Sequence, residues 1–175
     1  MRNIVQQFNR PRPAVTVLVA IWVSLMVAGC GFHLRGQADL PFERIYVESN
    51  GFSLFAAELR RIIQSGESVE VVDTMEQAQV VLQVLGESEK KEILSLSPSG
   101  SVNEYQLLYQ VRYRVTNNRG KDLVSPGDIS LRRDMTYDDT ETLGKESEEA
   151  LLFRSMQVDA VQQMLRRLAV VLVES

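Results

Sequence analysis

The chain has 175 residues, a formal net charge of −4, one cysteine and one histidine. Its composition is that of an ordinary globular protein, which excludes a disordered or fibrous class, and a lone cysteine excludes an intramolecular disulfide or a cysteine-based metal cluster. Three of its 19 basic residues and none of its 23 acidic residues precede Cys30, so the remainder carries about −7, which excludes a general nucleic-acid binder.

The first 29 residues predict an export signal. Residues 1–13 contain three arginines and no acidic residue, and residues 14–27 are almost entirely apolar. This order is typical of a secretory signal peptide, and the apolar run is shorter than the ~20 residues that a membrane-spanning helix needs. We therefore expect residues 1–29 to be removed.

The only cysteine follows the apolar run directly. Val27-Ala28-Gly29-Cys30 is an aliphatic residue, two small residues and a cysteine, which is the pattern of a bacterial lipobox. We expect Cys30 to be acylated and residues 30–41 to tether the protein to a membrane; the alternative is an unmodified thiol. Several acyl chains give stable anchoring, whereas one chain holds only marginally. Gly31 rather than Asp at the next position favours the outer membrane, on its periplasmic side, by the sorting rule of enteric bacteria.

The first half of the mature chain predicts strands around one helix. Residues 42–49 are rich in β-formers, and a helix is expected from the capping residue Ser53 to about Gln64. Residues 69–73 and 80–85 predict two further strands. A β-α-β run favours parallel first and second strands with the helix on one sheet face.

The next segment predicts long strands joined by turns. Gly86 is expected to bulge or bend the third strand before a charged stretch, residues 87–92, and residues 93–96 to continue it. Residues 104–116 alternate apolar and polar side chains with a period of two, apart from Leu108. The apolar positions are Tyr105, Leu107, Tyr109, Val111, Tyr113 and Val115.

The C-terminal segment predicts a broken strand and a helix. Residues 121–124 and 129–137 predict strand pieces separated by Ser125-Pro126-Gly127, and residues 146–173 carry a helical apolar stripe. The expected fold class is α+β: a two-layer α/β sandwich in which two helices pack on one face of a mixed four- to five-stranded sheet. Residues 42–175 would form this single periplasmic domain.

Catalytic chemistry is not predicted. His33 lies in the tether and Cys30 is expected to be acylated, so no Ser-His-Asp or Cys-His arrangement can form. There is no phosphate-binding glycine motif, and we expect no metal site and no cofactor. The alternative is an enzyme that uses carboxylates from distant segments.

Basic residues cluster around the second predicted hairpin of an otherwise acidic domain. Arg112, Arg114 and Arg132 are the ones that we expect to bind an anion such as phosphate, because screening limits the reach of the surrounding acidic charge to about 10 Å. The alternative is a solvated sheet face with alternating charges.

The segment after the lipobox resembles a known family. Cys30 to Gly36 reads Cys-Gly-Phe-His-Leu-Arg-Gly and closely resembles the start of the mature lipopolysaccharide-assembly lipoproteins of the LptE family. Asn103-Glu-Tyr-Gln106 looks like that family's central hairpin. The segment from Thr142 to Glu149, with Met156 and Leu165-Arg-Arg-Leu168, looks like its C-terminal part.

The resemblance implies a non-enzymatic α/β sandwich that plugs the large outer-membrane β-barrel LptD, assists its assembly, and binds lipopolysaccharide for delivery to the outer leaflet. It also implies that Lys145 contacts lipopolysaccharide. A second basic position of the family falls near Pro98, where this chain has no basic residue. The alternative function is a stand-alone envelope lipoprotein that binds or chaperones an anionic lipid.

Overall fold

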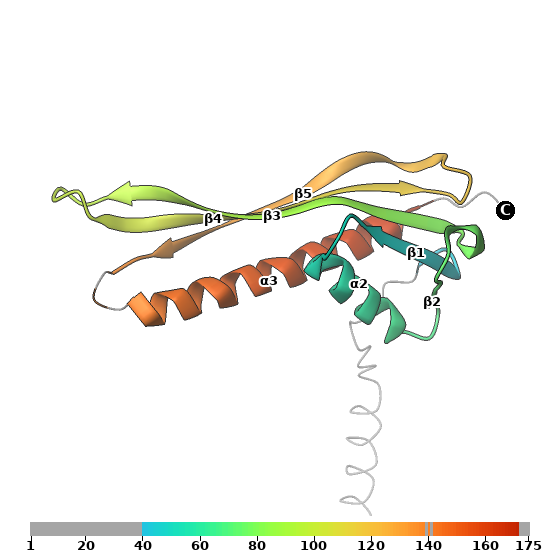
Figure 1. Cartoon of the computed structure of the whole chain (residues 1–175), viewed down its shortest axis with the longest axis horizontal. Helices are drawn as coiled ribbons and strands as arrows, with labels where there is room; N and C mark the ends of the chain where they lie inside the picture. Colours follow the sequence, from blue (N-terminus) through green and yellow to red (C-terminus); the bar gives the residue numbers. More distant parts are fainter. Residues whose placement is uncertain (1–39, 139, 141, 172–175) are drawn as a thin grey trace, which may run out of the picture. The chain divides into compact units, whose positions relative to one another are not determined.

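The computed structural model describes residues 40–138, 140 and 142–171, so the predicted signal peptide, Cys30 and most of the predicted tether lie outside the described residues. Figure 1 shows the order of the elements. They are β1 (Arg44–Ser49), α2 (Leu54–Gln64), β2 (Glu70–Val71), the 3-10 turn η1 (Met75–Gln77), β3 (Val80–Leu96), β4 (Val102–Thr116), β5 (Asp122–Thr136) and α3 (Thr142–Leu168).

The five strands form one mixed sheet in the order β2-β1-β3-β4-β5. β1 pairs in parallel with β2 and β3, and β3, β4 and β5 are antiparallel neighbours. Both helices lie on one side of the sheet (Figure 1). This arrangement confirms the predicted α+β class, the two layers and the parallel first pair of strands, and none of the described helices covers the other sheet face.

The short helix α2 begins where its capping residue predicts. The Ser53 hydroxyl oxygen accepts a hydrogen bond from the Ala56 amide at 3.0 Å, which satisfies one of the free N–H groups of the first turn. Phe55, Ala56, Leu59 and Ile63 are buried toward the sheet. Helical spacing of apolar residues and a good cap therefore account for this element.

The alternation along β4 builds the centre of the core. Leu107, Tyr109 and Val111 are completely buried under the helices, while the residues between them point to the other face. On the neighbouring strand Ile129 and Met135 are also buried. The predicted inward face of β4 is confirmed.

The strand β3 differs from its prediction, because the charged residues 87–92 lie inside a single strand that runs to Leu96. Val84 pairs with Tyr113 and Gly86 with Arg112, so Leu85 is an extra residue in β3. This β-bulge exchanges the faces of the residues from Gly86 to Ile93. Continuous pairing with β4 satisfies the backbone of the charged stretch, which is why it remains a strand.

The strand β5 is also continuous, so the predicted break at Ser125-Pro126-Gly127 is wrong. Tyr113 pairs with Gly127 and Val115 with Val124, so β5 carries one extra residue there. Pro126 lacks an N–H group but costs no ladder hydrogen bond at a bulge of an edge strand. Similarly, β2 is shorter than the predicted strand 69–73.

The helix α3 begins earlier and ends earlier than the predicted range 146–173. Its first residue is Thr142, and after Leu168 the chain forms i→i+3 bonds at Val170 and Val171. The helix is held to three strands. Glu149 accepts from Lys91 of β3 at 2.6 Å, Asp159 accepts from Arg133 of β5 at 2.5 Å, and Arg167 donates to the Tyr113 hydroxyl of β4.

Candidate functional site

The outer face of the sheet, which lies away from the helices, carries the predicted arginines. Period-two alternation places Arg112 and Arg114 of β4 on the side away from the helices, and Arg132 of β5 pairs with Leu108 on that same side. Arg112 and Leu108 are four residues apart, so Arg112 and Arg132 are separated by about 14 Å along the strands. The structure thus brings these three arginines onto one face, at different positions along it.

Arg114 is bound within the protein. Its Nε atom lies 2.6 Å from the Asp122 carboxylate, and its Nη2 atom donates to the Gly120 carbonyl at 3.5 Å. The hydrogen bond to Asp122 raises the pKa of Arg114 above its ordinary value. On the same row of the sheet the Gln83 amide donates to Glu48 at 2.8 Å. Arg114 therefore braces the turn between β4 and β5 and is less available to a ligand.

Arg112 is exposed and has no hydrogen-bond or ion-pair partner among the residues that the structure describes. Its guanidinium lies over Gly86, since a Cβ atom at Gly86 would stand 2.9 Å from Arg112 Nη2. The acid opposite, Asp128, instead accepts from the Gln110 amide at 3.3 Å. The missing side chain at Gly86 thus leaves room for the Arg112 guanidinium, whose N–H groups have no acceptor among the described residues.

Lys145 lies elsewhere, near the start of α3. Its ammonium group donates to Glu148 at 2.9 Å and to the Thr136 hydroxyl at 3.4 Å, and only 15% of its side chain is exposed. Thr136 is four residues beyond Arg132 along β5, so Lys145 does not join the arginines in one site. An anion at Lys145 has to compete with Glu148.

The inner face of the sheet, which the helices cover, holds a charged group that sequence reasoning missed. Glu87 accepts hydrogen bonds from the Ser53 hydroxyl at 2.7 Å, from the Phe55 amide at 3.3 Å and from the Tyr109 hydroxyl at 2.6 Å. Burial, and then the bond to Glu87, raises the pKa of Tyr109 far above its ordinary value. The carboxylate thereby joins β3, β4 and the N-terminus of α2, where negative charge is favourable.

A second inner-face group lies further along the hairpin. The Lys91 ammonium stands 4.2 Å from the centre of the Tyr105 ring and 5.6 Å from that of Tyr137, and it bonds Glu149 of α3. The two rings are edge-to-face at 5.1 Å. These cation–π and ion-pair contacts connect α3 to the strands and hold the Lys91 side chain on the inner face.

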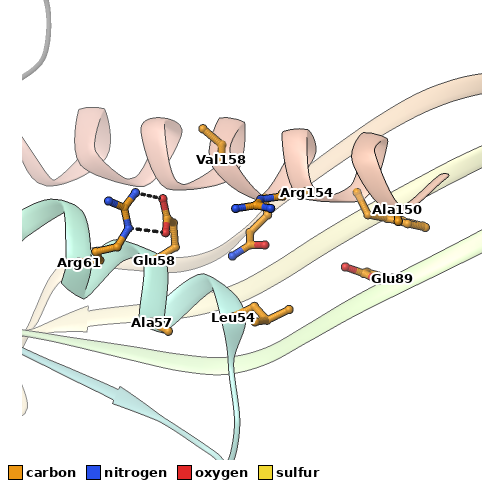
Figure 2. Close-up of a pocket in the computed structure, with 10 residues that line it drawn as sticks. Leu54, Ala57, Glu58, Arg61, Glu89, Ala150, Arg154 and Val158 are labelled. Carbon is orange, nitrogen blue, oxygen red and sulfur yellow. Dashed lines mark hydrogen bonds and ion pairs between the residues drawn. The ribbon is translucent and has the colours of Figure 1, made fainter. Parts of the chain in front are cut away.

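A crevice of about 730 Å³ lies between α2 and α3 (Figure 2). Leu54, Phe153 and Val158 line it together with Glu58 and Glu89. Two acids in one crevice are what a carboxylate-based enzyme needs. However, both Glu58 oxygens accept from Arg61, at 2.8 and 2.5 Å, and the bond to Arg61 lowers the pKa of Glu58.

The other acid of the crevice, Glu89, has a raised pKa because of burial and because Glu87 and Glu149 are near. A general acid–base pair needs both carboxylates to reach one reacting atom. With Glu58 held by Arg61, the crevice does not present two available carboxylates. Among the described residues no group of three or more potential ligands is placed to hold a metal ion, and no helix in them is long and apolar enough to cross a membrane.

Comparison with known proteins gives one consistent match. The family model described as LptE, lipopolysaccharide-assembly, matches residues 42–168. The LPS-assembly lipoprotein LptE of Yersinia pestis (strain Pestoides F) is 31% identical over 160 residues, which cover 90% of this chain and 76% of that protein.

Two solved structures have the same fold. The solution structure of lipoprotein B from Nitrosomonas europaea is 38% identical with a TM-score of 0.70, covering 79% of this chain and 90% of that one. The crystal structure of the rare lipoprotein B from Shewanella oneidensis is 29% identical with a TM-score of 0.64, covering 73% and 94%.

Proposed function

The chain belongs to the lipopolysaccharide-assembly family LptE, and from this premise we propose that it is the outer-membrane lipoprotein subunit of the lipopolysaccharide transport machinery. The family consists of non-enzymatic lipoproteins of lipopolysaccharide assembly, so the chain is an envelope lipoprotein with a role in that process. The match over residues 42–168 is the observation that carries the proposal.

The anchor is part of this proposal. Acylation of Cys30 holds the protein on the periplasmic side of the outer membrane. The lipobox at residues 27–30 and the lipoprotein names of the relatives support this placement. The tether from Cys30 to Pro41 spans at most about 40 Å when extended, so the domain stays near the membrane surface.

The partner is an LptD-type β-barrel that this domain plugs and helps to assemble. A barrel lumen is polar, and the outer face of the sheet offers a matching surface of arginine, glutamine, serine and acidic side chains. The edge strand β5 also needs protection from unwanted pairing, which enclosure by a partner supplies.

The ligand is lipopolysaccharide, which carries phosphate groups. Arg112 and Arg132 support its binding because their guanidinium groups have no internal partner in the described part of the chain. Arg114, the third predicted arginine, is left out of this proposal because Asp122 holds it. Lys145 is a separate contact at the start of α3.

Purification of the acylated protein in mild detergent tests the proposal. We expect one large barrel protein to be recovered with it, and depletion of the lipoprotein to reduce both barrel assembly and surface lipopolysaccharide. Recovery as a monomer that binds an anionic lipid, with normal barrel assembly after depletion, would support the stand-alone lipoprotein instead.

A further inference from the structure

The outer face carries another cation, Lys90, that has no partner among the described residues, and the bulge at Leu85 explains why the sequence pattern does not predict it. Before the bulge Val81 and Gln83 face outward, whereas after it Ser88 and Lys90 do. A regular strand would have turned Lys91 outward and Lys90 inward. Lys90 is exposed and, like Arg112 and Arg132, has no partner within the described residues.

Lys90 and Arg132 lie on one row of the sheet. Lys90 pairs with Leu108, and Leu108 pairs with Arg132, so the two cations flank a single leucine. Two strand spacings separate their Cα atoms, or about 10 Å. Their long side chains reach across Leu108 to a common point, where a lysine ammonium and an arginine fork together suit one phosphate.

Uncharged polar side chains lie between this pair and Arg112. Ser88, Gln110 and Ser130 form the row between them, since Gln110 pairs with both serines. Two of the nearby acids are bonded to glutamines. Asp134 accepts from the Gln106 amide at 3.1 Å on the next row, beside Glu92, and Asp128, which pairs with Arg112, accepts from Gln110. The surface is therefore cationic at both ends and hydrogen-bonding in the middle.

We propose that Lys90 and Arg132 bind one phosphate of lipopolysaccharide and Arg112 a second, with the Ser88–Gln110–Ser130 row contacting the sugar between them. This inference rests on the proposed function and adds to it the chemical group that is recognised, the spacing, and the residue Lys90. Four residues along β4 place the two phosphate positions about 14 Å apart.

The test compares binding of two probes to the acylated full-length protein in detergent: intact lipopolysaccharide, and the same lipopolysaccharide after phosphatase treatment. The double variant Lys90→Gln, Arg132→Gln is expected to lower affinity for the intact probe about tenfold or more, since two charge-assisted contacts to phosphate are lost. Arg112→Gln is expected to lower it less. Affinity for the dephosphorylated probe is expected to be weak and equal in all variants.

The strand provides matched controls. Arg133→Gln removes a neighbouring arginine whose side chain faces the helices, and Arg114→Gln removes an outer arginine that Asp122 already holds. Both are expected to bind intact lipopolysaccharide nearly as the unchanged protein does. Arg132→Lys keeps the positive charge and is expected to retain most of the affinity that Arg132→Gln loses. This comparison separates the effect of the charge from any effect on folding.

The outcomes are distinguishable. If the unchanged protein does not bind lipopolysaccharide, the proposed function fails. If it binds and the double variant binds equally well, the phosphate surface is refuted while the function stands. The surface is also refuted if the double variant loses affinity equally for both probes, because the loss then does not depend on phosphate.

Discussion

Replacement of Glu87 by glutamine is expected to destabilise the domain by about 2 kcal/mol. The carboxylate accepts from Ser53, from Phe55 and from Tyr109, whose side chain is completely buried. The neutral amide loses the charge at the N-terminus of α2, worth up to ~2 kcal/mol in a partly buried site. It also turns its NH2 donor toward the Ser53 hydroxyl or toward the Tyr109 hydroxyl, and in either orientation toward the Phe55 N–H.

Tyr109→Phe removes one bond to a charged acceptor and is expected to cost about 1.5–3 kcal/mol. Because the two variants remove the same bond, the double variant is expected to lose about 1 kcal/mol less than the sum. Urea unfolding of the mature chain, followed by circular dichroism, measures these differences as shifts in midpoint at constant slope.

The control is Glu92→Gln, the same change on the same strand but on the outer face, where no hydrogen bond to Glu92 occurs in the described part of the chain. It is expected to change stability by no more than about 0.5 kcal/mol. If Glu87→Gln unfolds at the same midpoint as Glu92→Gln, the stabilising role of the Glu87 carboxylate is refuted. If the Glu87 and Tyr109 effects add fully, the energetic coupling of these two side chains is refuted.

Three further predictions concern other parts of the domain. Lys145→Glu is expected to weaken lipopolysaccharide binding in the same detergent assay, whereas Glu148→Gln, which frees Lys145, strengthens it or leaves it unchanged. The pKa of Glu89 is raised, so the folded state holds its proton more tightly and stability is lost as pH rises through and above the ordinary carboxyl pKa of 4.5. Glu89→Gln should flatten that fall in unfolding midpoints. Gly144→Ala, in a helix with open space, should stabilise by up to ~1 kcal/mol, whereas Gly120→Ala, at a φ of 80°, should cost about as much.

Local patterns were sufficient to predict most of the layers. The alternation around Tyr109 and the capping Ser53 report directly on which face is buried and where a helix begins, because both depend on residues close in sequence. The same holds for the apolar stripe of the last helix, in which Met156, Ala160 and Met164 are buried.

Features that depend on residues distant in the sequence could not be predicted in full. Gly86 predicted a bulge or bend in β3, but only the pairing with β4 shows that Leu85 is an extra residue and that Lys90 rather than Lys91 faces outward. Likewise, whether an arginine is free or bound depends on a neighbouring strand: Asp122 holds Arg114, while the acid opposite Arg112 bonds to Gln110. The predicted anion-binding set therefore contained one bound arginine and lacked one lysine.

The three attachments of α3 have a mechanical consequence for the opposite side of the sheet. Glu149, Asp159 and Arg167 follow one another at intervals of about 15 and 12 Å along the helix axis, and each is tied to a different strand. A rigid rod fastened in this way resists changes in sheet twist. The spacing of side chains on the outer face is thus maintained from the helix side, and because three attachments share this role, the loss of one leaves two to hold the sheet.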